Sequence, residues 1–128
     1  MDSESKQPTV LLIEDDTDQI FLYQSKFELE GFEFISSRTG DEGIAKAKTQ
    51  KPDVILLDLV LIAESGIDVL EKLKKDEATK NIPVLILTNL VQKEKKEKAL
   101  KLGAADFLIK TDMMPSDVVK KVKAVLRK

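Results

Sequence analysis

The stretch Pro52-Asp53-Val54-Ile55-Leu56-Leu57-Asp58 decides the fold of this chain. Four consecutive apolar residues run from Val54 to Leu57, and a carboxylate follows them directly. A continuous apolar run of this length, bounded by proline before and charge after, is typical of a strand buried on both faces in a parallel sheet. Asp58 then lies at the carboxyl end of a central strand, where open α/β sheets place their ligands.

Four further strands and five helices are predicted around this one. The strands are residues 9–13, 32–35, 84–87 and 105–109, and the helices are 17–30, 39–50, a helix capped by Ser65, 92–102 and one beginning at Pro115. Gly31 and Gly103 end two of the helices. The alternation predicts a doubly wound, flavodoxin-like α/β fold with a five-stranded parallel sheet in the order 2-1-3-4-5. The alternating strand 32–35 is expected at or near an edge.

The helix faces follow from the spacing of apolar residues. In the helix 17–30 we expect Leu22 and Phe27, with Tyr23, to face the sheet, while Ile20 and Phe21 point elsewhere; the alternative is a helix rotated from this orientation. In the helix 39–50 we expect Ile44 and Ala45 to point inward, and the face of the helix after Ser65 is Ile67, Leu70 and Leu73.

The composition excludes several kinds of chemistry. The 128 residues suit one domain and include no cysteine and no histidine. Disulfides, thiol chemistry, Cys/His zinc sites and a Ser-His-Asp triad are therefore excluded, and a metal must be held by oxygen. Any phosphohistidine must come from another molecule. No apolar run approaches the roughly 20 residues that a membrane span needs.

Residues 1–8 are expected to be a disordered lead-in and residues 9–128 the domain. The lead-in is polar and lacks signal-peptide character, so we expect a cytoplasmic location. Residues 1–64 carry a net charge of −8 and residues 65–128 a net charge of +6. The basic half is interpreted as solvated helix faces, or alternatively as a partner-docking surface on the last two helices. No motif indicates nucleic acid.

Polar residues directly follow four of the predicted strands, and these are Glu14, Asp15, Asp58, Thr88 and Lys110. Taken singly, a threonine or an acid after a strand can be a helix cap, as we expect for Asp16, and a lysine can be a surface residue. Together they are expected to converge at one edge of the sheet. Three close carboxylates repel one another, and a divalent cation, Mg²⁺ or alternatively Mn²⁺, relieves that repulsion.

The same residues provide the parts for phosphoryl transfer. A metal-bound aspartate can act as a nucleophile and form an aspartyl phosphate. An ammonium such as that of Lys110 and a hydroxyl such as that of Thr88 can neutralise and bind the phosphoryl oxygens. The chain lacks a Gly-rich phosphate loop, so ATP is not the expected phosphoryl donor.

From Val10 to Leu126 the chain resembles the receiver domain of response regulators in two-component signalling. The resemblance is carried by the motifs LLIEDD, PDVILLDL, Ser65-Gly66, PVLILT and GAADFLIK. It implies that Asp58 accepts phosphate from a histidine kinase or a phosphotransfer protein. No membrane partner is expected, because the chain has no apolar run long enough for a span. The resemblance also implies that Asp15 and the Val60 carbonyl ligate Mg²⁺ directly, and that Glu14 acts on the metal mostly through water. Thr88 and Lys110 would bind the phosphoryl group. Phe107 matches the aromatic switch position of the family.

The sequence departs from the family pattern near the site. Ile62 and Thr111 stand where the family commonly has proline, and Asn89 stands where a small residue is typical. Phe107 lacks the hydroxyl of a tyrosine, so a switch there acts by packing. Val60 and Leu90 lie two residues past Asp58 and Thr88, and neither can orient an attacking water. We therefore expect slow self-dephosphorylation.

Three functions are compatible with these residues. The leading hypothesis is a stand-alone phosphoacceptor switch without an output domain, which catalyses its own phosphorylation and slow dephosphorylation without being a conventional enzyme. Phosphorylation would pull Thr88 inward and alter a downstream-partner face formed by residues 92–102, 105–109 and 115–126. The alternatives are a non-phosphorylated interaction module with a vestigial pocket, and a magnesium-dependent phosphatase, which would need an acid where Val60 stands.

Overall fold

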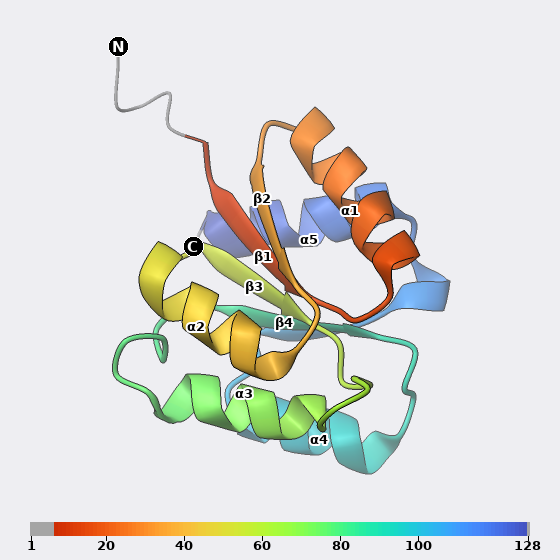
Figure 1. The fold of residues 1–128 in the computed structure, drawn as a ribbon. Coiled ribbons are helices and arrows are strands. Elements are labelled where there is room, and N and C mark those ends of the chain that lie inside the picture. Colours follow the sequence, from red (N-terminus) through yellow and green to blue (C-terminus); the bar gives the residue numbers. More distant parts are fainter. Residues whose placement is uncertain (1–6, 128) are drawn as a thin grey trace.

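The computed structural model describes residues 7–127, and its elements alternate as predicted (Figure 1). In chain order they are β1 (Thr9–Ile13), α1 (Thr17–Leu29), β2 (Glu33–Ser37), α2 (Gly40–Gln50), β3 (Val54–Leu57), α3 (Gly66–Lys75), β4 (Val84–Thr88), α4 (Lys93–Lys101), β5 (Asp106–Ile109), the 3₁₀ helix η2 (Lys110–Asp112) and α5 (Pro115–Leu126). The sheet is parallel throughout, in the order β2-β1-β3-β4-β5. The predicted fold class and strand order are confirmed.

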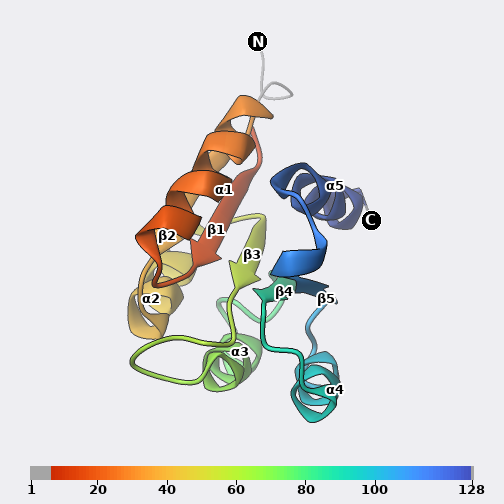
Figure 2. The ribbon, with the colours of Figure 1, turned by 90° about the vertical axis from the view of Figure 1, so that its right-hand side faces the viewer.

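The sheet lies between two layers of helices, because its central strands are apolar on both faces (Figures 1 and 2). All four residues of β3 are fully buried. Ile55 and Leu57 belong to the core cluster beneath α2, α3 and α4, whereas Val54 and Leu56 belong to the cluster beneath α1 and α5. Burying apolar side chains on both faces is the main stabilising contribution of such a strand.

The register brings the carboxyl ends of the strands to one edge. Ile13 of β1 pairs with Leu57 of β3, which pairs in turn with Ile86 of β4, and Thr88 pairs with Ile109 of β5. Residues that follow these positions therefore emerge side by side, as the sequence predicts for an open α/β sheet.

Local sequence signals set several helix ends. The Asp16 side chain caps α1 by accepting hydrogen bonds from the main-chain N–H groups of Asp18 and Gln19, at 2.9 and 3.3 Å. Ser65 caps α3 in the same way. Gly31 and Gly103, with φ of +91° and +108°, follow α1 and α4 in the left-handed region that favours glycine. These caps and stops confirm the predictions.

The predicted faces of α1 and α2 are partly wrong. Ile20, Tyr23 and Phe27 face the sheet, whereas Leu22 is 45% exposed. Leu22 and Phe27 are five positions apart, about 140° around a helix, so they cannot share one narrow face. The rotated alternative is the one observed.

In α2 the buried residues are Gly40, Gly43 and Ala47, with Ile44 half-buried and Ala45 exposed. Small residues let this helix lie close to β1: a Cβ on Gly43 would come within 2.5 Å of the Ile13 side chain. The centre of the buried face therefore lies at the small residues.

β2 forms one edge of the sheet, which confirms its predicted position. The Lys46 ammonium donates a hydrogen bond to the main-chain carbonyl of Ser36 in this strand, at 2.6 Å. Of the expected lead-in, residues 1–6 lie outside the described residues. Pro8 is ordered by the sheet, because its carbonyl accepts a hydrogen bond from Glu33 N–H at 2.9 Å.

No helix within residues 7–127 combines the length and the apolar character that crossing a membrane requires. All peptide bonds in this part of the chain are trans, including that between Lys110 and Thr111.

Candidate functional site

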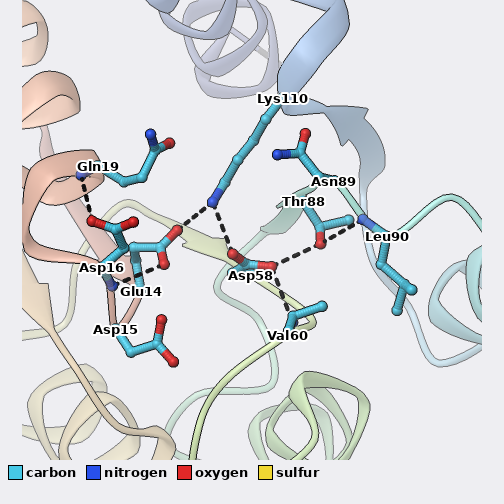
Figure 3. Close-up of a pocket in the computed structure, with 10 residues that line it drawn as sticks. All are labelled: Glu14, Asp15, Asp16, Gln19, Asp58, Val60, Thr88, Asn89, Leu90 and Lys110. Carbon is cyan, nitrogen blue, oxygen red and sulfur yellow. Dashed lines mark hydrogen bonds and ion pairs between the residues drawn. The ribbon is translucent and has the colours of Figure 1, made fainter.

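A pocket of about 440 Å³ opens at the carboxyl edge of the sheet (Figure 3). It is lined by the residues that follow β1, β3, β4 and β5 together with the first turn of α1: Glu14, Asp15, Asp16, Gln19, Asp58, Val60, Thr88, Asn89, Leu90 and Lys110. The predicted polar set therefore does converge. Gln19, which was not predicted as a site residue, reaches the pocket because it lies in the first turn of α1, directly after the acids that follow β1.

Asp58 is the centre of the hydrogen-bond network. The residue is only 5% exposed, and both of its carboxylate oxygens accept hydrogen bonds. Oδ1 accepts the Thr88 hydroxyl at 2.7 Å and the Val60 main-chain N–H at 3.0 Å, and Oδ2 accepts the Lys110 ammonium at 2.8 Å. The carboxylate is thus held in one orientation at the floor of the pocket.

Lys110 bridges two carboxylates across the pocket. Its ammonium pairs with Asp58 Oδ2 and also with Glu14 Oε1 (Figure 3). The other oxygen of Glu14 accepts the main-chain N–H of Asp16 at 3.1 Å. Glu14 is 2% exposed, so this lysine supplies the positive charge that a buried acid pair needs.

The electrostatics of the three groups differ. Burial raises the pKa of Glu14 to about 7, against the lowering effect of Lys110 and the Asp16 N–H. Burial also raises the pKa of Asp58, but hydrogen bonds from Lys110, Val60 and Thr88 outweigh it, so the net shift is downward. Burial lowers the pKa of Lys110, and the two carboxylates more than restore it. Asp58 is therefore ionised and Lys110 protonated at neutral pH.

Asp15 lines the pocket but does not join this network. Its Oδ2 accepts the main-chain N–H of Ile62 at 2.7 Å, from the loop that follows β3. Its own carbonyl accepts the Arg38 Nε–H at 3.2 Å. Figure 3 shows the Asp15 carboxylate apart from the dashed lines that join Glu14, Lys110 and Asp58. Asp15 thus lies at the pocket as expected, whereas its hydrogen bond with Ile62 was not predicted.

The donor chemistry of the pocket fits a hard divalent cation. Its acidic groups are the carboxylates of Glu14, Asp15 and Asp58, and oxygen donors are what Mg²⁺ prefers. Within residues 7–127, no three acidic side chains are already arranged as a metal cage. Lys110 lies between two of the carboxylates, and the third is held by Ile62.

The other predicted residues take different positions. Thr88 is fully buried, and its hydroxyl donates to Asp58, the acceptor that a buried hydroxyl needs. The inward movement expected on phosphorylation stays a prediction. Phe107 lies outside the pocket, buried in the core cluster beneath α4. Asn89 accepts the Thr111 N–H at 3.0 Å and so connects β4 to η2.

Comparison with known proteins places the chain among signalling proteins. A model of the response regulator receiver domain matches residues 10–123. The phosphate regulon transcriptional regulatory protein PhoB of Pseudomonas aeruginosa is 33% identical over 94% of this chain and 52% of its own length. Protein PilH of the same organism is 31% identical over 91% of this chain and 96% of PilH. The chain spans about half the length of the transcriptional regulators PhoB and PhoP that it matches.

Solved structures agree with the sequence matches. A CheY-like response regulator receiver domain protein of Methanospirillum hungatei superposes with a TM-score of 0.89 at 26% identity, and the match covers 95% of each chain. The receiver domain of the Francisella response regulator 1452 superposes with a TM-score of 0.85 at 30% identity, covering 94% of this chain and 98% of that one.

Proposed function

The chain belongs to the response regulator receiver family of two-component signalling, and on that premise we propose that Asp58 is its phosphoryl acceptor. The observation that carries this proposal is the environment of the Asp58 carboxylate. It is ionised, nearly buried, and oriented by Lys110, Thr88 and the Val60 N–H within a pocket large enough for a phosphoryl group.

The transfer requires a phosphohistidine on a partner, because this chain has no histidine. One carboxylate oxygen of Asp58 attacks the phosphorus, the phosphorus–nitrogen bond breaks, and the imidazole leaves with the electron pair and takes a proton. The partner is a histidine kinase or a phosphotransfer protein. Lys110 and Thr88 then bind oxygens of the transferred group, as their positions beside Asp58 support.

We place the metal site at the same carboxylates. Glu14, Asp15 and Asp58, with the Val60 carbonyl, would hold Mg²⁺ or Mn²⁺, which supplies charge neutralisation for the phosphoryl oxygens. The support is the oxygen-only acid set that lines one pocket. The role of the chain is to bring these oxygens together and to keep Asp58 ionised.

The signal would leave through the face formed by α4, β5 and α5. A groove of about 420 Å³ lies on this face, lined by Val91, Gln92, Lys93, Lys96, Phe107 and Ile109. Val91 is 71% exposed, so the groove offers apolar contact beside lysines. Phe107 forms part of both the groove and the core, so a change in core packing on phosphorylation would alter the groove that a downstream protein contacts.

The test is intact-mass measurement after incubation with acetyl phosphate and Mg²⁺. Wild type is expected to gain one phosphoryl group, whereas Asp58→Asn is expected to gain none. The matched control is Asp53→Asn. Asp53 precedes β3 at the end opposite to Asp58, and its carboxylate accepts the Thr9 N–H. Equal labelling of wild type and Asp58→Asn would refute the assignment.

A non-phosphorylated interaction module is the second candidate. The observation that favours it is the bond between Asp15 and Ile62, which removes one carboxylate from the network around Asp58. This candidate predicts that wild type stays unlabelled at any Mg²⁺ concentration, so the same experiment decides between the two.

A further inference from the structure

We propose that the main-chain N–H of Ile62 competes with the divalent cation for the Asp15 carboxylate, so that the loop of residues 59–64 sets how tightly this site holds metal. The inference rests on the proposed function and deepens it. It makes Ile62 a positioning residue, acting through its backbone on Asp15.

The competing bond is short and specific. The Ile62 N–H donates to Asp15 Oδ2 at 2.7 Å, across 47 positions of the chain. A hydrogen bond of this length to an ionised acceptor is among the stronger kinds in proteins. The side chain of Ile62 is 88% exposed, so packing of the side chain does not explain why this residue sits here. The contact between the loop and Asp15 is made by the backbone.

The loop that presents this N–H is anchored on both sides. Val60 and Ser65 form an isolated antiparallel bridge, and Gly66 N–H donates to the Leu59 carbonyl at 2.9 Å. Glu64 is held by the Gly40 N–H at 2.8 Å. Between these anchors the Ile62 amide has a defined position, so the hydrogen bond to Asp15 needs little further ordering of the loop.

The energetic consequence is a penalty on metal binding. The Ile62 N–H already donates to one of the two Asp15 carboxylate oxygens, so a cation that binds Asp15 must share or displace this charge-assisted partner. A bond of this kind is of the order that changes an affinity about tenfold. The resemblance to receiver domains puts proline at the position of Ile62, and proline has no N–H to donate. This chain therefore carries a competitor that a proline at position 62 would remove.

The experiment measures Mg²⁺ binding without any phosphoryl donor. Mg²⁺ alone is titrated into wild type, Ile62→Pro and Ile62→Ala while backbone amide NMR signals are followed. Ile62→Pro lacks the N–H and is expected to bind Mg²⁺ about tenfold more tightly. Ile62→Ala keeps the N–H and loses only an exposed side chain, so its affinity is expected to equal that of wild type.

A second variant and a second readout guard against changes in loop shape. Replacing the amide between Leu61 and Ile62 by an ester removes the N–H and leaves an ordinary side chain at position 62; it is expected to tighten binding as proline does. In wild type the exposed Ile62 amide is expected to exchange its hydrogen about tenfold more slowly than that of Ala63, and saturation with Mg²⁺ should abolish the difference.

Three outcomes would overturn the inference. Equal Mg²⁺ affinity of wild type, Ile62→Pro and the ester form would refute it and leave Asp58 phosphorylation untouched. An Ile62 amide whose exchange ignores Mg²⁺ would refute it as well. Absence of Mg²⁺ binding in every form would refute both this inference and the proposed metal site, whereas failure of the acceptor proposal appears separately, as an unlabelled Asp58 in the mass measurement.

Discussion

Replacing Gly66 by alanine is expected to lower the free energy of unfolding by about 2 kcal/mol. Gly66 is the first residue of α3, where the chain returns from the loop to the end of β3. A Cβ built there would lie 2.4 Å from the Asp58 carbonyl oxygen and 2.4 Å from the Leu59 Cα, both of them backbone atoms. Either the helix or the strand end must therefore move by about 1 Å to reach ordinary contact.

The magnitude follows from two opposing contributions. Overpacking a dense region costs up to about 3 kcal/mol, and the upper end applies because no flexible side chain can swing aside. Alanine in place of glycine returns at most about 1 kcal/mol in a helix. The net loss of about 2 kcal/mol corresponds to a melting temperature lower by roughly 8 °C for a domain of this size.

The assay is urea unfolding followed by far-UV circular dichroism, since the chain has no tryptophan. Gly43→Ala is the matched control, because its Cβ would meet side-chain atoms of Ile13 and not backbone. It should also lower the free energy of unfolding, but by less than Gly66→Ala does, because the Ile13 side chain can turn aside in part whereas backbone atoms cannot. If Gly66→Ala proved as stable as wild type, the close approach of α3 to Asp58 would not be the constraint described here.

Three further outcomes are expected. Val60→Asn combined with Leu90→Gln should shorten the lifetime of the phosphorylated protein at least about tenfold by intact mass, because polar groups there can orient the attacking water; an unchanged lifetime contradicts this. Thr79→Val should lower the free energy of unfolding in urea by about 1–2 kcal/mol, because the buried Thr79 hydroxyl donates at 2.7 Å to a carbonyl of α3. Thr49→Val should leave it almost unchanged, because the Thr49 hydroxyl is exposed. Burial lowers the pKa of Lys74 below 10.5, so between neutral pH and 10.5 the unfolded chain binds more protons than the folded chain. The free energy of unfolding of wild type should therefore rise relative to that of Lys74→Met as the pH rises from neutral toward 10.5. A difference between the two proteins that does not change with pH refutes this.

The strand ends were predictable because each candidate residue follows an unbroken aliphatic run. Asp58, Thr88 and Lys110 lie at the carboxyl ends of adjacent strands, and in a parallel sheet these ends lie side by side at one edge. The orientation of α1 was not predictable in the same way. Four apolar residues in succession, from Ile20 to Tyr23, spread over most of the circumference of the helix, and only packing against β2 and α5 selects among them.

The partner of Asp15 was also beyond the sequence pattern. The bond to Ile62 depends on the path of a loop that follows a different strand, and no local propensity encodes that path. Similarly, the orientation of the Thr88 hydroxyl depends on which acceptor remains available once the site has formed. The residue types of the site were thus predictable, whereas their pairing required the three-dimensional arrangement.

The ammonium of Lys46 on the margin of β2 has a consequence for self-association. In parallel pairing, Ser37 O faces β1, so the Ser36 carbonyl points outward, where an incoming strand from another molecule would seek its first acceptor. Lys46 already donates to that carbonyl, and its charge would have to be desolvated when another strand packs against β2. The protein should therefore resist fibril formation through the β2 edge even at high concentration. A substitution that removes the Lys46 charge, such as Lys46→Met, should make fibril formation easier.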